Sequence, residues 1–389
     1  MHKTVIALAI AGMAAAPAFA DSNVTLYGSV DYGYGARSGD SGLSKANLGP
    51  GNPKQEFTSD ITGTNALGFK GAEDLGNGTK VIFELEAGFL ADDGTNSLPG
   101  GSNNPNGPIF RRHSFVGATG DWGTALGGRI DGARYGVSVR YDPFKAGGVA
   151  NMSSLQVHAT RADNAIAYVT PNVEGLYAVV AYTSQLIGQE HGYNQLDSRL
   201  WVIQPNYVYG PFSATLNYEH LTVHNTDAKI NIYVGAASYD FGVAKITGYY
   251  EHVKTDGSNA TLTTPGCDAV SLDHMHPLTG AGSALCDQNS WMIGGTVPIT
   301  ENDTVKASYV DYTDKSGAAN SCRKWGIGGQ HDLSKRTSLF IDFASITQRD
   351  HGACTIFFNG YQSSADDGTG NNTGGVGTRG YDLGIVHRF

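Results

Sequence analysis

The sequence contains little charge, few cysteines and few tryptophans, and it has no long apolar run beyond its first twenty residues. Only 16% of its 389 residues are charged, against about 25% in ordinary soluble domains. Its 26 basic residues are outnumbered by 36 acidic ones, so a net charge of −10 argues against a nucleic-acid partner. No later stretch approaches the roughly 18 uncharged apolar residues of a membrane helix. With a mean hydropathy of −0.24, this excludes a multi-span helical membrane protein.

Glycine and tyrosine are abundant instead, with 53 and 20 copies. Both are poor helix formers, so a helical bundle or coiled coil is excluded. Glycine shows no three-residue period, which excludes collagen. A hydrophobic content of 40% excludes a disordered chain.

The first twenty residues read as a secretory signal. Lys3 supplies a positive charge, residues 5–16 form a short apolar run, and Ala18-Phe19-Ala20 matches the small-x-small cleavage rule. The run is too short to be a membrane anchor. The sequence therefore predicts a signal peptide at residues 1–20 and one exported domain at residues 21–389, which could enter a membrane only as strands.

Several segments alternate between apolar and polar residues, which predicts strands with one apolar and one polar face. They are Thr79 to Phe89, Ser213 to Glu219, Lys324 to Leu333 and Gly380 to Phe389. In the first of them, Val81, Phe83, Leu85 and Ala87 oppose Lys80, Glu84 and Glu86.

The connectors between such segments are alternately short and long. The short ones have turn compositions and lie at residues 74–78, 120–123, 171–175, 210–211, 240–242, 300–303 and 333–335. The long ones lie at residues 36–63, 91–109, 130–162, 186–197, 224–228, 254–288, 315–322 and 348–377. Seven short and eight long connectors separate sixteen strands, each of about ten residues, the length that a tilted membrane strand needs.

An even number of strands with short turns at one end and long loops at the other predicts an all-β fold, a 16-stranded antiparallel transmembrane β-barrel. Closure is required because lipid offers no hydrogen-bond partners to the edge of a sheet. Aromatic residues near the strand ends fit the girdles of such barrels: Tyr32, Tyr34, Tyr207, Tyr209, Tyr239, Phe241, Tyr249 and Tyr250.

Two strands fit the pattern poorly. Ser198 to Gly210 contains Pro205 at its centre, and Val305 to Asp314 changes phase near Val310. A bulge or a contact between subunits would explain either irregularity.

The four cysteines all lie in the last third of the chain, and an exported chain can form disulfides. Among the three possible pairings we favour Cys267–Cys286, within one long loop, and Cys322–Cys354, between neighbouring loops. The alternative is a metal site at Cys267, His274, His276 and Cys286, although its spacing matches no common zinc pattern.

Several motifs are similar to those of one family. The segments concerned are Val24 to Gly28, Leu67 to Gly76, Arg112 to Gly117, Arg161 to Tyr168 and His387-Arg388-Phe389. They resemble, in order, parts of the Gram-negative trimeric general diffusion porins of the betaproteobacterial and neisserial type, and the last resembles the assembly signal ending in Phe389. The resemblance implies a homotrimer in the cell outer membrane, in contact with its lipid and lipopolysaccharide, through which small hydrophilic solutes and ions diffuse passively.

The resemblance also implies that the third long loop, about residues 130–162, folds inward and narrows the channel. Arg112 and Arg161 match family arginines, whereas a third such position is occupied here by Ala66. The candidate constriction residues are Arg112, Arg129, Asp131, Arg134, Arg140, Asp142, Lys145 and Arg161. Their excess of positive charge predicts a preference for anions. In the alternative interpretation the arginines pair with Asp131, Asp142, Glu84 or Glu86 and only hold the loop.

Other functions remain as alternatives. A substrate-specific outer-membrane channel is the nearest one, followed by an adhesin, an outer-membrane enzyme and a secreted sandwich. The sequence contains neither Gly-x-Ser-x-Gly nor His-Glu-x-x-His, so no enzyme, catalytic residue, resident metal or cofactor is predicted. Acidic residues of the outer loops could bind divalent ions beside lipopolysaccharide, but solubility alone also accounts for them.

Overall fold

The computed structural model describes residues 23–38, 55–94, 109–155, 160–186, 188, 190, 198–223, 229–256, 287–315, 320–350, 354, 356 and 377–389. The expected signal peptide, together with Cys267, His274, His276 and Cys286, lies outside these residues. Within the described part of the chain, no helix is long and apolar enough to cross a membrane.

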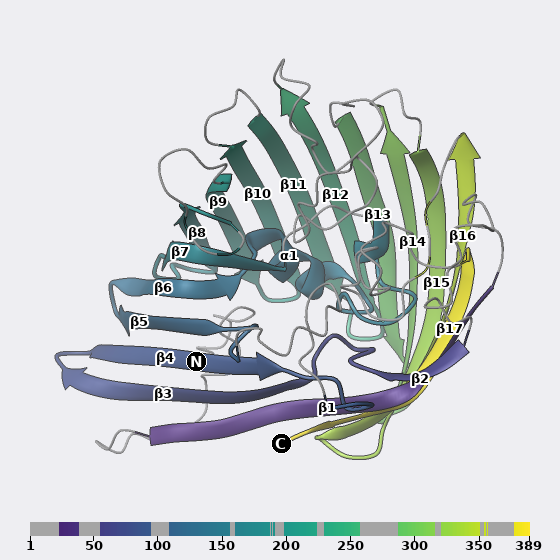
Figure 1. Ribbon diagram of the computed structural model, residues 1–389, viewed down its shortest axis with the longest axis horizontal. Helices are drawn as coiled ribbons and strands as arrows, with labels where there is room; N and C mark the ends of the chain where they lie inside the picture. The colour runs from purple at the N-terminus through teal and green to yellow at the C-terminus, as the bar shows by residue number, and fades with distance from the viewer. Residues whose placement is uncertain are drawn as a thin grey trace.

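Strands form almost the whole structure (Figure 1). They are β1 (Asn23–Ser38), β2 (Gln55–Ser59), β3 (Ala66–Gly76), β4 (Thr79–Gly88), β5 (Ser114–Gly120), β6 (Gly123–Asp131), β7 (Arg161–Val169), β8 (Leu176–Thr183), β9 (Ser198–Tyr209), β10 (Phe212–Val223), β11 (Lys229–Asp240), β12 (Lys245–Asp256), β13 (Asp287–Pro298), β14 (Asp303–Asp314), β15 (Asn320–Asp332), β16 (Thr337–Asp350) and β17 (Arg379–Arg388). Each strand from β3 on pairs antiparallel with the next one in the chain.

The sheet closes through β1. Its residues Ser29 to Ser38 pair with β17 along one edge. Along the other edge, Asn23 to Ser29 pair with β3 and Tyr32 to Ala36 pair with β2. Because β2 and β3 occupy the same position in the barrel, separated by Asp60 to Asn65, seventeen strands fill sixteen positions. The predicted 16-stranded antiparallel barrel is confirmed, but β2 was expected to be loop.

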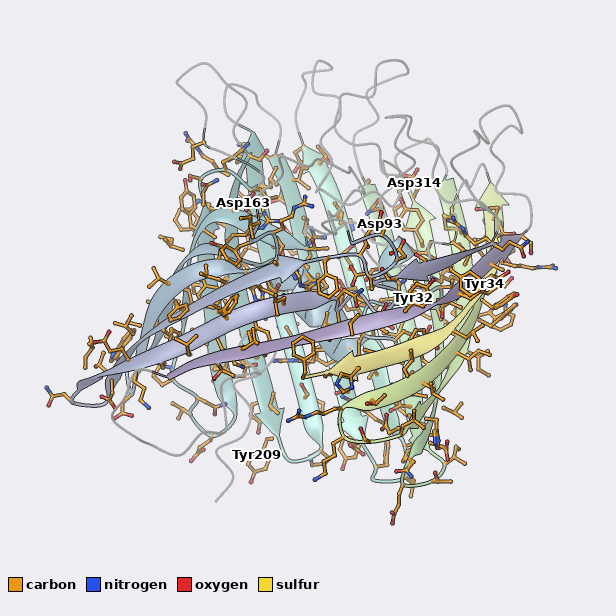
Figure 2. All side chains as sticks on the ribbon, turned by 60° about the horizontal axis from the view of Figure 1, so that its bottom comes forward. Tyr32, Tyr34, Asp93, Asp163, Tyr209 and Asp314 are labelled. Atoms are coloured by element: carbon orange, nitrogen blue, oxygen red, sulfur yellow. A yellow bond between two sulfur atoms is a disulfide. The ribbon has the colours of Figure 1, made fainter. Side chains whose placement is uncertain are left out.

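The expected asymmetry of the connections is also confirmed. All seven short turns join strands at one end of the barrel, and the strand ends that lead into the long connections lie at the other end. Figure 2 shows Tyr209, at a short turn, at the end opposite to Asp314, where β14 leads into a long connection.

The alternation of side chains divides outside from inside as the sequence predicts. On β17, Leu383 and Ile385 are each 42% exposed, whereas Asp382 between neighbouring outward residues is fully buried. On β15, Trp325 and Ile327 face outward while Lys324 is buried. Exposed apolar side chains of this kind recur on every long strand, which suits a surface in contact with lipid. Tyr249 departs from the expected girdle because it lies buried inside the barrel.

The two irregular strands keep their register. Pro205 lies opposite Ala178 of β8, and the ladder between β9 and β10 skips it and resumes unshifted. The missing N–H of proline therefore interrupts the ladder without a bulge. On β14, Val310 and Tyr312 point inward and are fully buried, so the strand does not change phase. Its apolar inner face has a partner inside the barrel.

That partner is the segment between β6 and β7, which lies inside the ring of strands (Figure 1). It carries the helix α1 (Ala133–Tyr141) and the short 3-10 helix η2 (Ser153–Leu155). The apolar side chains of this loop, such as Val137 and Met152, form the main buried cluster with inward residues such as Val310. Each fully buried side chain of this size contributes roughly 1.5–3 kcal/mol, so the loop is fixed to the wall by apolar packing.

The tip of this loop, residues 142–148, also contacts the segment Asp60 to Asn65, which interrupts the strand position shared by β2 and β3. The backbone N–H of Gly148 donates to the carbonyl of Ile61 at 2.6 Å. A Cβ atom on Gly147 would lie 2.7 Å from the Thr62 carbonyl oxygen, so this approach requires glycine. Asp31 holds the break in turn by accepting hydrogen bonds from the backbone of Ile61 and Thr62 at 3.0 and 2.8 Å.

The predicted disulfide Cys322–Cys354 is confirmed, with a Cα–Cα distance of 6.5 Å. It connects β15 to the segment that follows β16. A crosslink between residues this far apart in sequence is worth about 2–4 kcal/mol because it restricts the unfolded chain. The proposed partner bridge, Cys267–Cys286, stays a prediction.

The last residue completes the barrel seam, which leads to a testable prediction. The backbone N–H and C=O of Phe389 exchange hydrogen bonds with Gly28 at 3.0 and 3.1 Å. Deleting Phe389 removes both bonds and the ring beside Gly28, so we expect a smaller fraction of the chain to fold into heat-modifiable barrel on denaturing gels. Phe389→Tyr is the matched control and should fold normally. Equal folding of the deletion and the control would contradict this role.

Candidate functional site: the channel constriction

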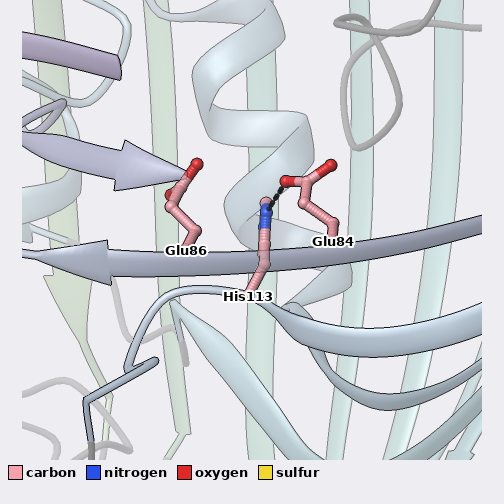
Figure 3. Close-up of side chains that lie close together, drawn as sticks. All are labelled: Glu84, Glu86 and His113. Atoms are coloured by element: carbon pink, nitrogen blue, oxygen red, sulfur yellow. Dashed lines mark hydrogen bonds and ion pairs between the residues drawn. The ribbon is translucent and has the colours of Figure 1, made fainter. Parts of the chain in front are cut away.

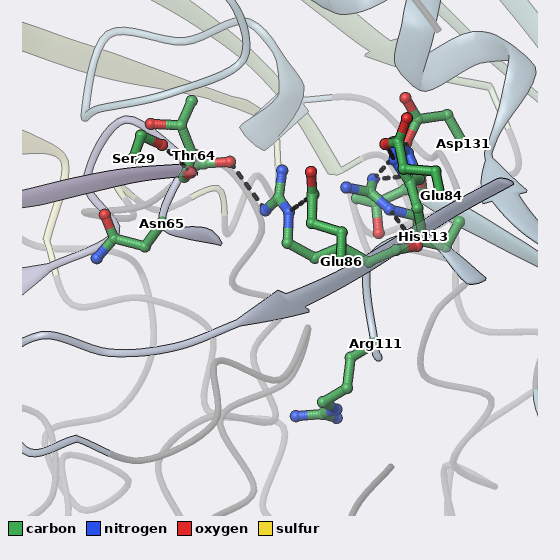
Figure 4. A network of polar contacts seen from close by, with 12 residues as sticks. Ser29, Thr64, Asn65, Glu84, Glu86, Arg111, His113 and Asp131 are labelled. Carbon is green, nitrogen blue, oxygen red and sulfur yellow. Dashed lines mark hydrogen bonds and ion pairs between the residues drawn. The ribbon is translucent and has the colours of Figure 1, made fainter. Parts of the chain in front are cut away.

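A polar network lies on the inner wall of β4 and β5, facing the inward loop (Figure 4). Glu84 and Glu86 alternate on β4 with apolar residues, so both carboxylates point into the barrel. The Tyr27 hydroxyl donates to both of them, at 2.8 Å from Glu84 and 2.9 Å from Glu86. This places two carboxylates side by side at the wall, where cations are needed to balance them.

His113, just before β5, bridges the wall and the loop. Its Nδ1 contacts Glu84 and its Nε2 lies 2.9 Å from Asp131 at the end of β6 (Figure 3 shows the Glu84 contact). Because both ring nitrogens face carboxylates, the ring is best satisfied as an imidazolium. Burial opposes this charge, but Asp131 and the two hydrogen bonds outweigh it and raise the pKa of His113 to about 9.

Arg112 and Arg161 join the same network. The Arg112 Nε contacts the Glu86 carboxylate, and its Nη1 donates to the Gly63 carbonyl at 3.2 Å. Arg161 lies 2.9 Å from Asp131 through Nη1 and donates from Nε to the Arg112 carbonyl at 3.0 Å. Three cations and three carboxylates thus meet where the loop leaves and rejoins the wall.

Two other candidate arginines hold the loop at different places. Arg129 pairs with Asp163 across β6 and β7. Arg134, on α1, is 2% exposed and pairs with Glu219 at 2.8 Å and Glu251 at 3.2 Å. These two glutamates point inward from β10 and β12, so the Arg134 guanidinium faces the wall behind the helix.

The remaining candidates lie along the end of α1 and the loop tip. Arg140 donates to the Tyr177 hydroxyl at 2.7 Å and to Asn206 at 3.2 Å. Asp142 is buried and accepts backbone hydrogen bonds from Phe144, Ala146 and Met152 at 2.9–3.1 Å, so it shapes the tip. Lys145 follows it and is exposed to the channel.

One set of side chains has the composition of a metal site. The ligand atoms of Glu84, Glu86 and His113 lie within 4.8 Å of one another. The chemistry of the set favours ion pairs, since both nitrogens of His113 and an oxygen of Glu86 already have partners. A metal would have to displace the proton of His113 and the guanidinium of Arg112.

Sequence reasoning missed the residues that balance these charges. It treated Glu84 and Glu86 only as possible partners of arginines, and it did not single out His113, Glu219 or Glu251. Alternation could have placed both pairs of glutamates inside the barrel, but not opposite a particular cation. Ala66, at the position of a third family arginine, is buried beside the Asp60 to Asn65 break.

The comparisons with known proteins agree with this geometry. Residues 5–351 match the model of a family described as Gram-negative porin. The chain belongs to the Gram-negative porin family. It is 29% identical to outer membrane porin protein 32 of Delftia acidovorans over the full length of both chains. It is also 29% identical to an outer membrane porin protein of Bordetella pertussis. That match covers 87% of this chain and 93% of the relative.

Among solved structures, the porin is similar to one titled an anion-selective porin from Comamonas acidovorans. The TM-score is 0.70 and the identity is 26%, with 95% of this chain and all of the other covered. These relatives and the closed barrel place the porin in the Gram-negative outer membrane as a channel for diffusion.

The buried Arg134 pairs generate a second prediction. Arg134→Met would leave Glu219 and Glu251 without their cation, which typically costs about 3–5 kcal/mol. We expect a lower thermal midpoint of the folded porin and noisier single-channel currents as the helix loosens. Adding Glu219→Gln and Glu251→Gln to the same variant should restore most of the stability. A midpoint for Arg134→Met equal to that of the native porin would refute the anchoring role.

His113 generates a prediction about pH. Because its pKa is raised from 6.5 to about 9, its ionic contacts are fully present below pH 6.5 and are lost as the pH rises through 9. One pKa unit corresponds to about 1.4 kcal/mol, so the loss is at most about 3.5 kcal/mol. The thermal midpoint should fall between pH 7 and 10 in the native porin and in the His331→Gln control. It should change much less over this range in His113→Gln; an identical fall in all three would exclude His113 as the cause.

Proposed function

We propose that this porin is a homotrimer whose barrels pass small hydrophilic solutes and ions with a preference for anions, and that it has no catalytic role. The diffusion pathway is narrowed by the loop between β6 and β7 where it faces β3 to β5. The single observation that supports this best is the packing of that loop inside the closed barrel, because a loop fixed there narrows the channel permanently.

The charges around the loop support the preference for anions. Arg112, Arg129, Arg134 and Arg161 are each paired with a carboxylate, so their charges are largely balanced locally. Lys145 at the tip is exposed, and no carboxylate of the described residues lies within 4.0 Å of it. A net positive group in a narrow passage with low-dielectric walls attracts anions.

The similarity to a porin titled anion-selective supports the same preference. The pairing of the arginines agrees with the alternative in which they chiefly hold the loop. We therefore assign the selectivity to unbalanced cations such as Lys145, while the paired arginines shape the passage.

Reversal potentials in planar bilayers test this proposal. In a gradient of potassium chloride the native porin should show chloride as the more permeant ion. Lys145→Glu should shift the reversal potential toward potassium, because it converts the exposed charge at the tip from positive to negative. Lys254→Gln is the matched control, since Lys254 lies on the outer face of β12 beside Asp256. A preference for potassium in the native channel would overturn the proposal.

A further inference from the structure

A row of inward-facing residues crosses three neighbouring strands between the inward loop and the end of the barrel that carries the short turns. This part of the lumen is called the turn side. In the strand pairing, Lys245 of β12 lies opposite Thr296 of β13, which lies opposite Lys306 of β14. Directly opposed residues of an antiparallel sheet share one face. The two lysines are separated by two strand spacings, about 10 Å between backbones.

The loop tip lies directly above this row. A Cβ atom on Gly294, the next inward position of β13, would lie 2.7 Å from Pro143 of the tip. The Lys306 ammonium lies 5.9 Å from the centre of the Phe144 ring. Lys145 is the next residue along the tip, so Lys145, Lys245 and Lys306, here called the lysine group, surround the same part of the lumen.

The lysine group differs from the arginines of the constriction because its charges are not balanced by contact. No carboxylate of the described residues lies within 4.0 Å of any of its three ammonium groups. The nearest acids by position are Asp240, which faces Lys245 in the strand pairing, and Asp332 on β15. Asp342 of β16 lies in the same row as Lys306, beyond Gly328 of β15, and interacts with it electrostatically without a direct ion pair. Asp240 is engaged with the backbone N–H of Gly242 at 2.8 Å in its own turn.

The electrostatics of Lys145 agree with this grouping. Its enclosure in the barrel and the charges of Lys306, Arg388 and Lys245 lower the pKa of its ammonium, and Asp332 offsets this only in part. Like charges held this close repel one another, so a bound anion with more than one charge would relieve the repulsion.

We propose that the lysine group, with the Thr296 hydroxyl between its two wall lysines, is a binding site for a small dianion of the phosphate class on the turn side of the constriction. The proposal rests on the anion preference proposed above and adds to it a saturable site. Ammonium groups act as mobile point charges toward phosphate oxygens, and three of them can meet one tetrahedral anion from different sides. A hydroxyl at the same level adds a donor.

Single-channel recordings with inorganic phosphate test the site. At fixed ionic strength, phosphate added to the turn side should reduce the chloride current of the native porin along a saturating curve. Lys245→Gln with Lys306→Gln should raise the half-saturating phosphate concentration by about tenfold or more, because each lost contact to a charged group is worth a comparable factor. Lys245→Arg with Lys306→Arg should keep the curve close to native, since the charges remain.

Lys254→Gln, on the outer face of the same strand as Lys245, should leave the phosphate curve unchanged. Calorimetric titration of phosphate into the native porin in detergent measures the binding without any variant, so a folding defect in the double variant does not decide the result. A current that falls without saturation and no heat of binding would overturn the site. The reversal potential of the native channel in potassium chloride is separate: chloride preference without saturable phosphate binding refutes the site alone, and potassium preference refutes the proposed selectivity.

Discussion

The absence of hydrogen-bond partners in lipid is the constraint on which the whole structure depends. A sheet satisfies its backbone there only when its last strand pairs with its first, and here β1 makes that closure with β17. A closed sheet of sixteen positions is too wide for its own side chains to fill. The wide interior that closure creates must therefore be occupied by another part of the chain or left to water.

The loop between β6 and β7 occupies part of that interior, and two kinds of interaction share the work of holding it. Apolar side chains of α1 and the tip pack on the inner faces of strands such as β14. These inner faces carry apolar residues at positions where a barrel filled only with water would carry polar ones. Ion pairs of Arg134 with the wall glutamates Glu219 and Glu251 then fix the orientation of the loop. At its ends, Asp131 contacts both Arg161 and His113. The valine and tyrosine side chains on the inner wall thus match the apolar side chains of the loop that pack against them.

Much of the fold could be predicted because a strand period of two and a turn composition are local signals. All seven short turns, the lipid-facing residues and the Cys322–Cys354 bridge followed from them. Val310 was misleading because alternation assigns apolar residues to the lipid side, and only the packing of a distant loop makes an inward valine favourable. The strand β2 was missed because it is short and shares its position with β3.

The candidate site was harder to predict because charge balance is a property of space. Counting Arg129 to Arg161 along the chain gives a basic segment, but Glu219 and Glu251 come from distant strands and balance the charge of Arg134. Glu86, on β4, does the same for Arg112. The field in the lumen is then set chiefly by charges that make no direct ion pair. Such charges can lie on ordinary wall positions such as Lys306, which interacts with Asp342 only across β15. In a channel of this design, different residues build the constriction and select the ions. An arginine in an ion pair holds the loop in place, whereas a lysine without an ion pair sets the electric field that acts on the permeating ions.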